Sequence, residues 1–247
     1  MANLSTQFER LRRSRAWTSV FRSGVGDSNL HRALAIQQNV FLHLASVKSR
    51  RRSISFRHTW FLGTLSMGCF LLLAITGVEL MFYYHPSAPQ AYADMKDLQF
   101  VVSAGVFLRN LHRWTAQAMV FVVFAHMFKV FYRGAYRPPR EFNWVIGVVL
   151  LMFTLLLSYT GYLLPWDQLS YWAITVGANI LSSVPILGPR VRFLLLGGHG
   201  VNANALLRFY VLHCLVLPLV AAAFIAVHFW RIRKDGGIYT GEKDNRG

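Results

Sequence analysis

The sequence has few acidic residues and almost no cysteine. Its 247 residues include 10 Asp and Glu against 26 Lys and Arg, so the formal net charge is +16. Cys69 and Cys214 stand alone inside apolar stretches, and the motif C-x-x-C-H does not occur. Two isolated thiols make a poor metal site, and without that motif ordinary covalent attachment of a c-type haem has no support. We expect both cysteines to be small core residues.

A secretory signal peptide is also missing from the sequence. The first 25 residues are basic and lack the uninterrupted apolar core and cleavage site of such a peptide. Residues 1–57 mix Arg with apolar positions, as in Phe41-Leu42-His43-Leu44. We predict an amphipathic helix on the inner membrane surface in this segment. A partly disordered basic tail is the alternative.

Apolar residues make up 54% of the chain and fall in long blocks. A helix that spans a membrane needs about 20 such residues, and four blocks reach that length. They are residues 59–84, 106–132, 144–164 and 206–230. The sequence therefore predicts an all-α integral membrane bundle of four helices over residues 58–235, with a short tail at 236–247.

The basic residues predict how this bundle crosses the membrane. Of the 26 Lys and Arg, 11 precede His58, four lie from Lys129 to Arg140, and five follow Trp230. Four spans bring these three regions to one face, which the positive-inside rule makes cytoplasmic, with both termini. Juxtamembrane cations account for the net charge, so we do not expect nucleic acid as a partner.

Four of the nine histidines lie inside two predicted spans: His112 and His126, then His213 and His228. Ionisable residues inside a membrane are costly and mark function by default; a hydrogen-bonded packing role is the alternative. The first two are 14 residues apart, about 3.9 turns and about 21 Å along a helix. The other two are 15 apart, and a bend at Pro218 could absorb the extra residue.

The second and fourth spans run in the same direction because a single span separates them. His112 is then expected opposite His213 near the outer surface, and His126 opposite His228 near the inner surface. Each pair can supply two axial nitrogens to one haem iron. Zinc is the competing metal, but it needs four ligands around one ion, and these pairs are about 20 Å apart.

Glycines repeat the 14-residue period in the other two spans, at Gly63 and Gly77 and at Gly147 and Gly161. Glycine lets a bulky planar group approach the backbone, which favours haem contact; small-residue helix packing is the alternative. Three cations lie within one turn of the second-span histidines and could bind haem propionates, unless they only snorkel to the interface. They are Arg109, Arg113 and Lys129.

Several segments resemble the cytochrome b family, in particular its short b6 type. They are RNLHRW around His112, AHMFK around His126, RPPREFNW at 137–144, TGYLLPWDQLSYWA at 160–173, and RFYVLHCLVLPL at 208–219. The 15-residue histidine step and the Asp of PWDQ are similar to the b6 form. The mitochondrial type usually has a 14-residue step and Gly there.

The resemblance implies a dihaem subunit of a proton-translocating quinol:cytochrome c oxidoreductase of the bc or b6f type. Quinol would be oxidised outside beside Tyr162, Leu163, Trp166 and Asp167, and quinone reduced inside. The inner quinone pocket is expected at Arg233, Lys234 and Asp235. The aromatic residues could instead be interfacial anchors, and the two cations could serve only the positive-inside rule.

Two positions depart from the b6 pattern. Phe61 stands where b6 has the cysteine that anchors an additional c-type haem, so we expect two non-covalent b-type haems and no covalent one. Glu79 stands near the outer end of the first span, where the family is usually apolar. It could handle protons near the outer haem or only pair with a nearby cation.

The resemblance also implies partners. The P-E-W-[YF] motif of longer cytochromes b is absent, so a subunit IV-like membrane protein is expected to supply it. A Rieske iron–sulfur protein, a cytochrome c-type acceptor, membrane lipid and a dimeric complex in a bacterial inner membrane are expected as well. A haem-bearing membrane anchor for a different dehydrogenase or reductase is the first alternative, and a non-redox transporter or channel is the second.

Overall fold

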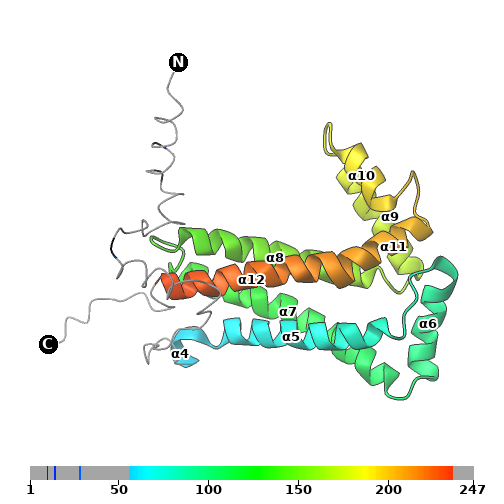
Figure 1. Cartoon of the computed structure of the whole chain (residues 1–247), viewed down its shortest axis with the longest axis horizontal. Coiled ribbons are helices and arrows are strands. Elements are labelled where there is room, and N and C mark those ends of the chain that lie inside the picture. Colours follow the sequence, from blue (N-terminus) through cyan, green and yellow to red (C-terminus); the bar gives the residue numbers. More distant parts are fainter. Residues whose placement is uncertain (1–9, 11–13, 15–27, 29–55, 236–247) are drawn as a thin grey trace. The chain divides into compact units, whose positions relative to one another are not determined.

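The structure is a computed structural model that describes residues 10, 14, 28 and 56–235. Every regular element among these residues is helical, which confirms the all-α prediction (Figure 1). The amphipathic helix predicted within residues 1–57 and the tail predicted at 236–247 lie outside the described residues.

Four stretches of helix are long and apolar enough to cross a membrane, as predicted. They are α5 (Leu62–Met81), α7 (Gly105–Tyr132), α8 (Glu141–Tyr162) and the continuous run Ala203–Lys234. At most 17% of the most apolar window of any of them is buried within the chain. Their apolar side chains therefore face outward, as expected of helices surrounded by lipid or other membrane subunits.

The last span is built from three consecutive helical segments. They are α11 (Ala203–Val211), a π-helical turn η2 (Leu212–Val216) and α12 (Leu217–Lys234). Within the turn, the amide of Leu217 donates to the carbonyl of Leu212, five residues back. Pro218 has no N–H to donate to Cys214, which removes one α-helical bond at this place. The π turn, rather than a bend at Pro218 alone, thus takes up the fifteenth residue between His213 and His228.

Four shorter helices complete the described chain. They are α4 (Phe56–Thr59), α6 (Ala88–Phe100), α9 (Gln168–Ser182) and α10 (Gly188–Leu196). Local signals explain their ends: the side chain of Asp167 caps α9, and Gly197 ends α10 at a φ of +68°. Asn202 caps α11 in the same way as Asp167 caps α9.

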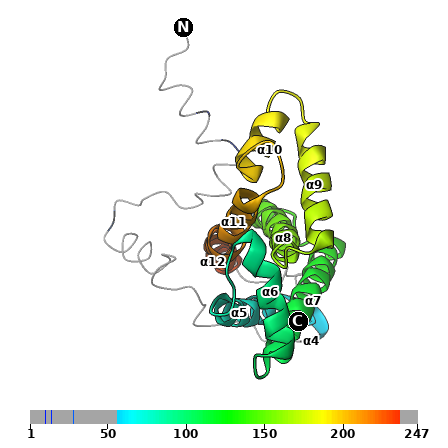
Figure 2. The ribbon, with the colours of Figure 1, turned by 90° about the vertical axis from the view of Figure 1, so that its right-hand side faces the viewer.

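The chain groups into two compact units. Residues 63–124 and 151–221 form one, here the His112/His213 unit; the other, the His126/His228 unit, has the described residues 56–62, 125–150 and 222–235. In the His112/His213 unit, α9, α10 and α11 pack around Leu163, Ile174 and Phe209 (Figure 1). A second cluster joins α6 to α11 through Tyr84, Ala91 and Leu206 (Figure 2).

Candidate functional site

His112 and His213 face each other within their unit. His112 comes from α7 and His213 from the π turn η2. Their ring centroids are 6.4 Å apart and the ring planes are inclined by 76°. Two metal–nitrogen bonds of about 2 Å each, with a metal between the rings, require centroids about 6 Å apart. The pair is therefore spaced to give two axial nitrogens to one metal ion.

A threonine hydroxyl binds the Nδ1 atom of each of these histidines. Thr76 Oγ1 lies 2.8 Å from His112 Nδ1, and Thr160 Oγ1 lies 3.1 Å from His213 Nδ1. Sequence reasoning missed both threonines. The signal was present, because each one directly precedes a predicted haem-face glycine, Gly77 or Gly161.

These two glycines leave room for the imidazoles themselves. A Cβ on Gly77 would lie 3.3 Å from His112 Cε1, and a Cβ on Gly161 only 2.6 Å from His213 Cε1. These two glycines thus clear space for the histidine rings, a role that was not predicted, and their contact with haem stays a prediction. Gly63, the first member of the period, is half-buried near the start of α5.

The second predicted pair, His126 and His228, belongs to the other unit. His126 lies on α7 and His228 on α12, and both are half-buried. A Cβ on Gly147 would lie 3.8 Å from His228 Cε1 and 3.5 Å from Met127 Sδ, which are ordinary contacts. Gly147 therefore lies against this histidine less tightly than Gly161 lies against His213.

The three predicted propionate-binding cations differ in their surroundings. Arg109 is half-buried and Arg113 is exposed. Lys129 lies with its Nζ 3.8 Å from the centre of the Trp60 ring, and this buried atom has no hydrogen-bond partner among the described residues. A buried ammonium with spare donors suits an anionic group such as a propionate.

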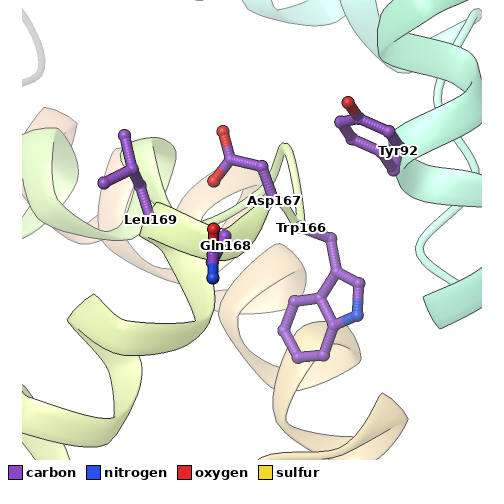
Figure 3. A pocket seen from close by; sticks show the side chains of 5 residues that line it. All are labelled: Tyr92, Trp166, Asp167, Gln168 and Leu169. Carbon is purple, nitrogen blue, oxygen red and sulfur yellow. The ribbon is translucent and has the colours of Figure 1, made fainter.

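Two of the predicted quinol-pocket residues line an open pocket of about 420 Å³ in the His112/His213 unit. Trp166 and Asp167 are joined there by Gln168 and Leu169, and Tyr92 reaches in from α6 (Figure 3). Tyr162 is 52% exposed and does not line this pocket, whereas Leu163 is fully buried in the core. Tyr92 was not predicted, because one exposed aromatic residue on a short helix gives no sequence signal.

Asp167 also has a structural task. Its Oδ1 accepts hydrogen bonds from the amide and the hydroxyl of Ser170, both at 2.8 Å, and so caps α9. Trp166, just before it, has a φ of +52°, in the left-handed region that L-residues rarely adopt. The cap fixes the backbone where the Trp166 side chain leaves it, so it shapes the pocket wall.

The chain before α6 is tied to the same loop. The Tyr84 hydroxyl donates to the carbonyl of Leu164 at 2.6 Å, and its ring stacks on Tyr210. Burial raises the pKa of the Tyr84 phenol well above its ordinary value, so the hydroxyl remains a donor. This bond holds the 164–167 loop against the segment that leads into α6.

Asp94 organises the turn before α6. Its carboxylate accepts from the backbone amide of His85 at 2.6 Å and from Gln90 at 3.0 Å, and it lies 3.0 Å from His85 Nδ1. Burial alone would raise the pKa of Asp94, but the hydrogen bonds from Gln90 and His85 hold that pKa below its ordinary value. The carboxylate is therefore ionised at neutral pH.

The predicted inner quinone residues lie at the end of α12. Asp235 is buried and forms an ion pair with Arg231 at 3.2 Å, with 0% of the Arg side chain and 1% of the Asp side chain exposed. Arg231 also lies over the Phe142 ring, at 5.1 Å. Arg233 and Lys234 are half-buried, and Lys234 Nζ lies 4.9 Å from the centre of the Trp230 ring. Sequence reasoning missed Arg231, which looks like one more cation at a membrane boundary.

The donor set fits haem and not zinc. Within residues 56–235 no group of three or more His, Cys, Asp or Glu could hold one metal ion. The His112/His213 pair instead offers two opposed imidazole nitrogens, and glycine clears the space beside each ring. Fold and site together define a multi-pass helical membrane protein equipped for bis-histidine haem ligation.

Comparison with known proteins places the chain in the cytochrome b family. A family model described as cytochrome b/b6/petB matches residues 47–236. Cytochrome b6 of Heliobacterium modesticaldum is 44% identical over 175 residues, which cover 71% of this chain and 82% of that protein. Cytochrome b6 of Stigeoclonium helveticum is 41% identical over 175 residues, which cover 71% of this chain and 81% of that protein. Membership implies a b-type haem.

A solved structure shares the fold. It is described as a hyperthermophilic respiratory complex III, with a TM-score of 0.68 and 28% sequence identity. The match covers 89% of this chain and 58% of that one. The chain therefore spans little more than half the length of this structural relative.

Proposed function

We propose that the chain is the dihaem cytochrome b subunit of a proton-translocating quinol:cytochrome c oxidoreductase of the bc or b6f type. The observation that carries the proposal is the opposed His112/His213 pair, with a centroid separation of 6.4 Å and a threonine on each Nδ1 atom. A second pair, His126 and His228, recurs 14 residues along α7 and 15 along the last span. When bound, the two b-type haems would supply one-electron transfer along the bundle.

Each half of the bundle contributes its own residues to haem binding. His112 and His213, with Gly77 and Gly161 beside their rings, would hold one haem, and Arg109 and Arg113 would neutralise its propionates. His126 and His228 would hold the other, next to Gly147 and with Lys129 as the propionate cation. Gly63 completes the glycine period on α5. The absence of cysteine at Phe61 is the basis for proposing that neither haem is covalent.

The pocket at the start of α9 is proposed as the outer quinol site. Trp166 and Tyr92 offer apolar walls to a flat ring, and the Asp167 carboxylate offers an acceptor to a quinol hydroxyl. Its Oδ1 is used by the cap, so Oδ2 is the oxygen available to a ligand. Tyr162, exposed one turn before this loop, would border the site. One electron would pass to a Rieske protein while the second crosses the membrane, and the two protons would leave outside.

The end of α12 is proposed as the inner quinone site. Arg233 and Lys234 would offer donors to a quinone carbonyl, and Asp235 would supply a carboxylate for proton uptake. Its ion pair with Arg231 fixes where that carboxylate lies. Two electrons, one from each of two quinol oxidations outside, would reduce one quinone here to quinol, with two protons taken up from the inner side.

The remaining parts of the proposal concern the surroundings of the chain. A subunit IV-like membrane protein, a Rieske iron–sulfur protein and a cytochrome c-type subunit or acceptor would complete a dimeric complex. We propose that both termini lie in the cytoplasm of a bacterium and that the spans lie in its inner membrane; the basic segments and the positive-inside rule support this orientation. The outward-facing apolar surface of the spans leaves ample area for lipid and for such partners.

Purification of the intact complex tests the proposed function. Dithionite-reduced minus ferricyanide-oxidised spectra should show b-type bands, and added quinol should reduce cytochrome c in a reaction that needs the Rieske partner. Co-purification with a molybdenum or nickel enzyme instead of a Rieske protein would favour the membrane-anchor alternative. A spectrum without a b-type band would overturn haem binding altogether.

A further inference from the structure

We propose that Thr76 and Thr160 are positioning residues that fix the proton of His112 and His213 on Nδ1 and thereby lower the reduction potential of the haem between them. The proposal rests on the proposed function, since it assumes a haem at this pair. Neither threonine touches the iron; each acts through the histidine that it binds.

The hydrogen bonds of each threonine decide the tautomer of its histidine. Thr76 Oγ1 lies 2.7 Å from the carbonyl oxygen of Leu72, and Thr160 Oγ1 lies 2.8 Å from that of Leu156. A carbonyl can only accept, and a hydroxyl has a single hydrogen to donate. That hydrogen goes to the helix carbonyl, so the hydroxyl oxygen must accept from the imidazole.

It follows that Nδ1 carries the proton in both histidines, and that Nε2 keeps its lone pair. Nε2 is the atom that must be free for an axial bond. Both threonines are buried, with 3% and 4% of the residue exposed, so water does not compete for these bonds. Burial also strengthens them, because the local dielectric constant is low.

The sequence places a threonine before the glycine beside each histidine of this pair and not of the other. Thr76 and Thr160 precede Gly77 and Gly161, while Leu62 and Ile146 precede the equivalent Gly63 and Gly147. Neither Leu nor Ile has a side-chain atom that could accept from a histidine. The two haem sites thus share the glycines and differ in the hydroxyls.

An acceptor on Nδ1–H makes the imidazole a better electron donor to a metal. A stronger donor stabilises ferric iron more than ferrous iron, so it lowers the potential at which the haem is reduced. The hydroxyls would act in this direction on the His112/His213 haem and leave the other haem unaffected.

The test uses four threonine variants and a matched control, in membranes that hold the complete complex. Thr160→Val and Thr76→Val remove the hydroxyl acceptor at nearly constant volume, and Thr160→Ser and Thr76→Ser keep it. Thr154→Val is the control, because Thr154 is also buried in α8, six residues from Thr160. Each sample is titrated potentiometrically, with the two haems followed by their optical bands and by low-temperature EPR.

The valine variants should raise the ratio of reduced to oxidised His112/His213 haem at fixed ambient potential by about three- to tenfold, tenfold being about 59 mV for one electron. The serine variants, the control and the His126/His228 haem should match wild type. If a valine variant loses the haem, the proposal requires the serine variant to retain it.

Three results would overturn the proposal. These are valine variants with wild-type potential and EPR spectrum, serine variants that shift or lose haem as the valine variants do, and equal shifts of both haems. The spectrum of the wild-type complex distinguishes any of these three results from failure of the proposed function. A wild-type complex with b-type haem and unresponsive threonines overturns only the role of the threonines.

Discussion

Substituting alanine for single glycines should damage haem binding in an order set by the distances to the histidine rings. A new Cβ at Gly161 would lie 2.6 Å from His213 Cε1, 3.1 Å from its Nε2 and 3.2 Å from its Nδ1. Carbon atoms do not approach so closely, so the His213 ring or the α8 backbone must shift. At Gly77 the shortest distance is 3.3 Å, and at Gly147 it is 3.5 Å, to Met127 Sδ.

The expected magnitude follows from these contacts. Overpacking a filled site costs about 1–3 kcal/mol, which lowers affinity for a ligand held by the displaced ring by about 5-fold to 150-fold. Gly161→Ala should lie at the upper end of this range, Gly77→Ala at the lower end, and Gly147→Ala near wild type. Gly68→Ala is the control: nothing lies within 4 Å of its new Cβ, and alanine favours the helix by roughly 1 kcal/mol.

The assay counts haem per polypeptide by pyridine haemochrome in purified protein, before and after challenge with a competing haem-binding protein. Gly161→Ala should lose the His112/His213 haem fastest and keep the other. Equal retention in all four variants would refute the reasoning, and so would greater loss from Gly68→Ala than from Gly161→Ala.

Three further predictions concern polar groups outside the paired histidines. Asp94→Asn should lower thermal stability at neutral pH and remove the part of the acid dependence that Asp94 causes. In the wild type the folded pKa of Asp94 is depressed, so its stabilising contribution is present above the ordinary pKa of 3.8 and is lost as the pH falls below that value. Thermal melts from about one pH unit below to about three above that pKa would detect the difference. Asp167→Ala should lower the free energy of unfolding by about 1 kcal/mol through loss of the α9 cap, whereas Asp167→Asn keeps an acceptor for that cap. Quinol oxidation by the Asn variant at the wild-type rate would mean that only the cap matters and would contradict a role of the carboxylate in the quinol site. Arg231→Met should destabilise the protein by about 3–5 kcal/mol because it leaves the buried Asp235 carboxylate without this cation. The double variant Arg231→Met, Asp235→Asn should recover part of that loss, as measured by denaturation in detergent. A double variant as unstable as the sum of the two single variants would contradict direct coupling between Arg231 and Asp235.

The features that were predicted well from the sequence depend on the length of the apolar runs and on the spacing of the histidines and glycines. A run of about 20 apolar residues commonly forms a helix that spans the membrane, so the four spans were predictable to within a few residues at most ends. The 14-residue step from His112 to His126, repeated by the glycines, places groups on one helix face by geometry alone. These inferences need no knowledge of which helices touch.

The missed features depend on contacts between helices. Thr76 and Thr160 look like ordinary residues of apolar spans until α5 and α8 bring them to Nδ1 atoms on other helices. Arg231 resembles any basic residue at a membrane boundary until its burial against Phe142 is seen. The π turn at His213 could not be distinguished from a proline bend, because both absorb one residue in a 15-residue step.

A count of haem in the purified wild-type protein and in two histidine variants tests dihaem binding most directly. Two b-type haems per chain are expected, both extractable with acidified acetone. His213→Leu and His228→Leu should each retain one haem, and the two retained haems should have different potentials. A wild-type count other than two, haem that remains attached after extraction, or loss of the same haem from both variants would contradict the proposed dihaem subunit.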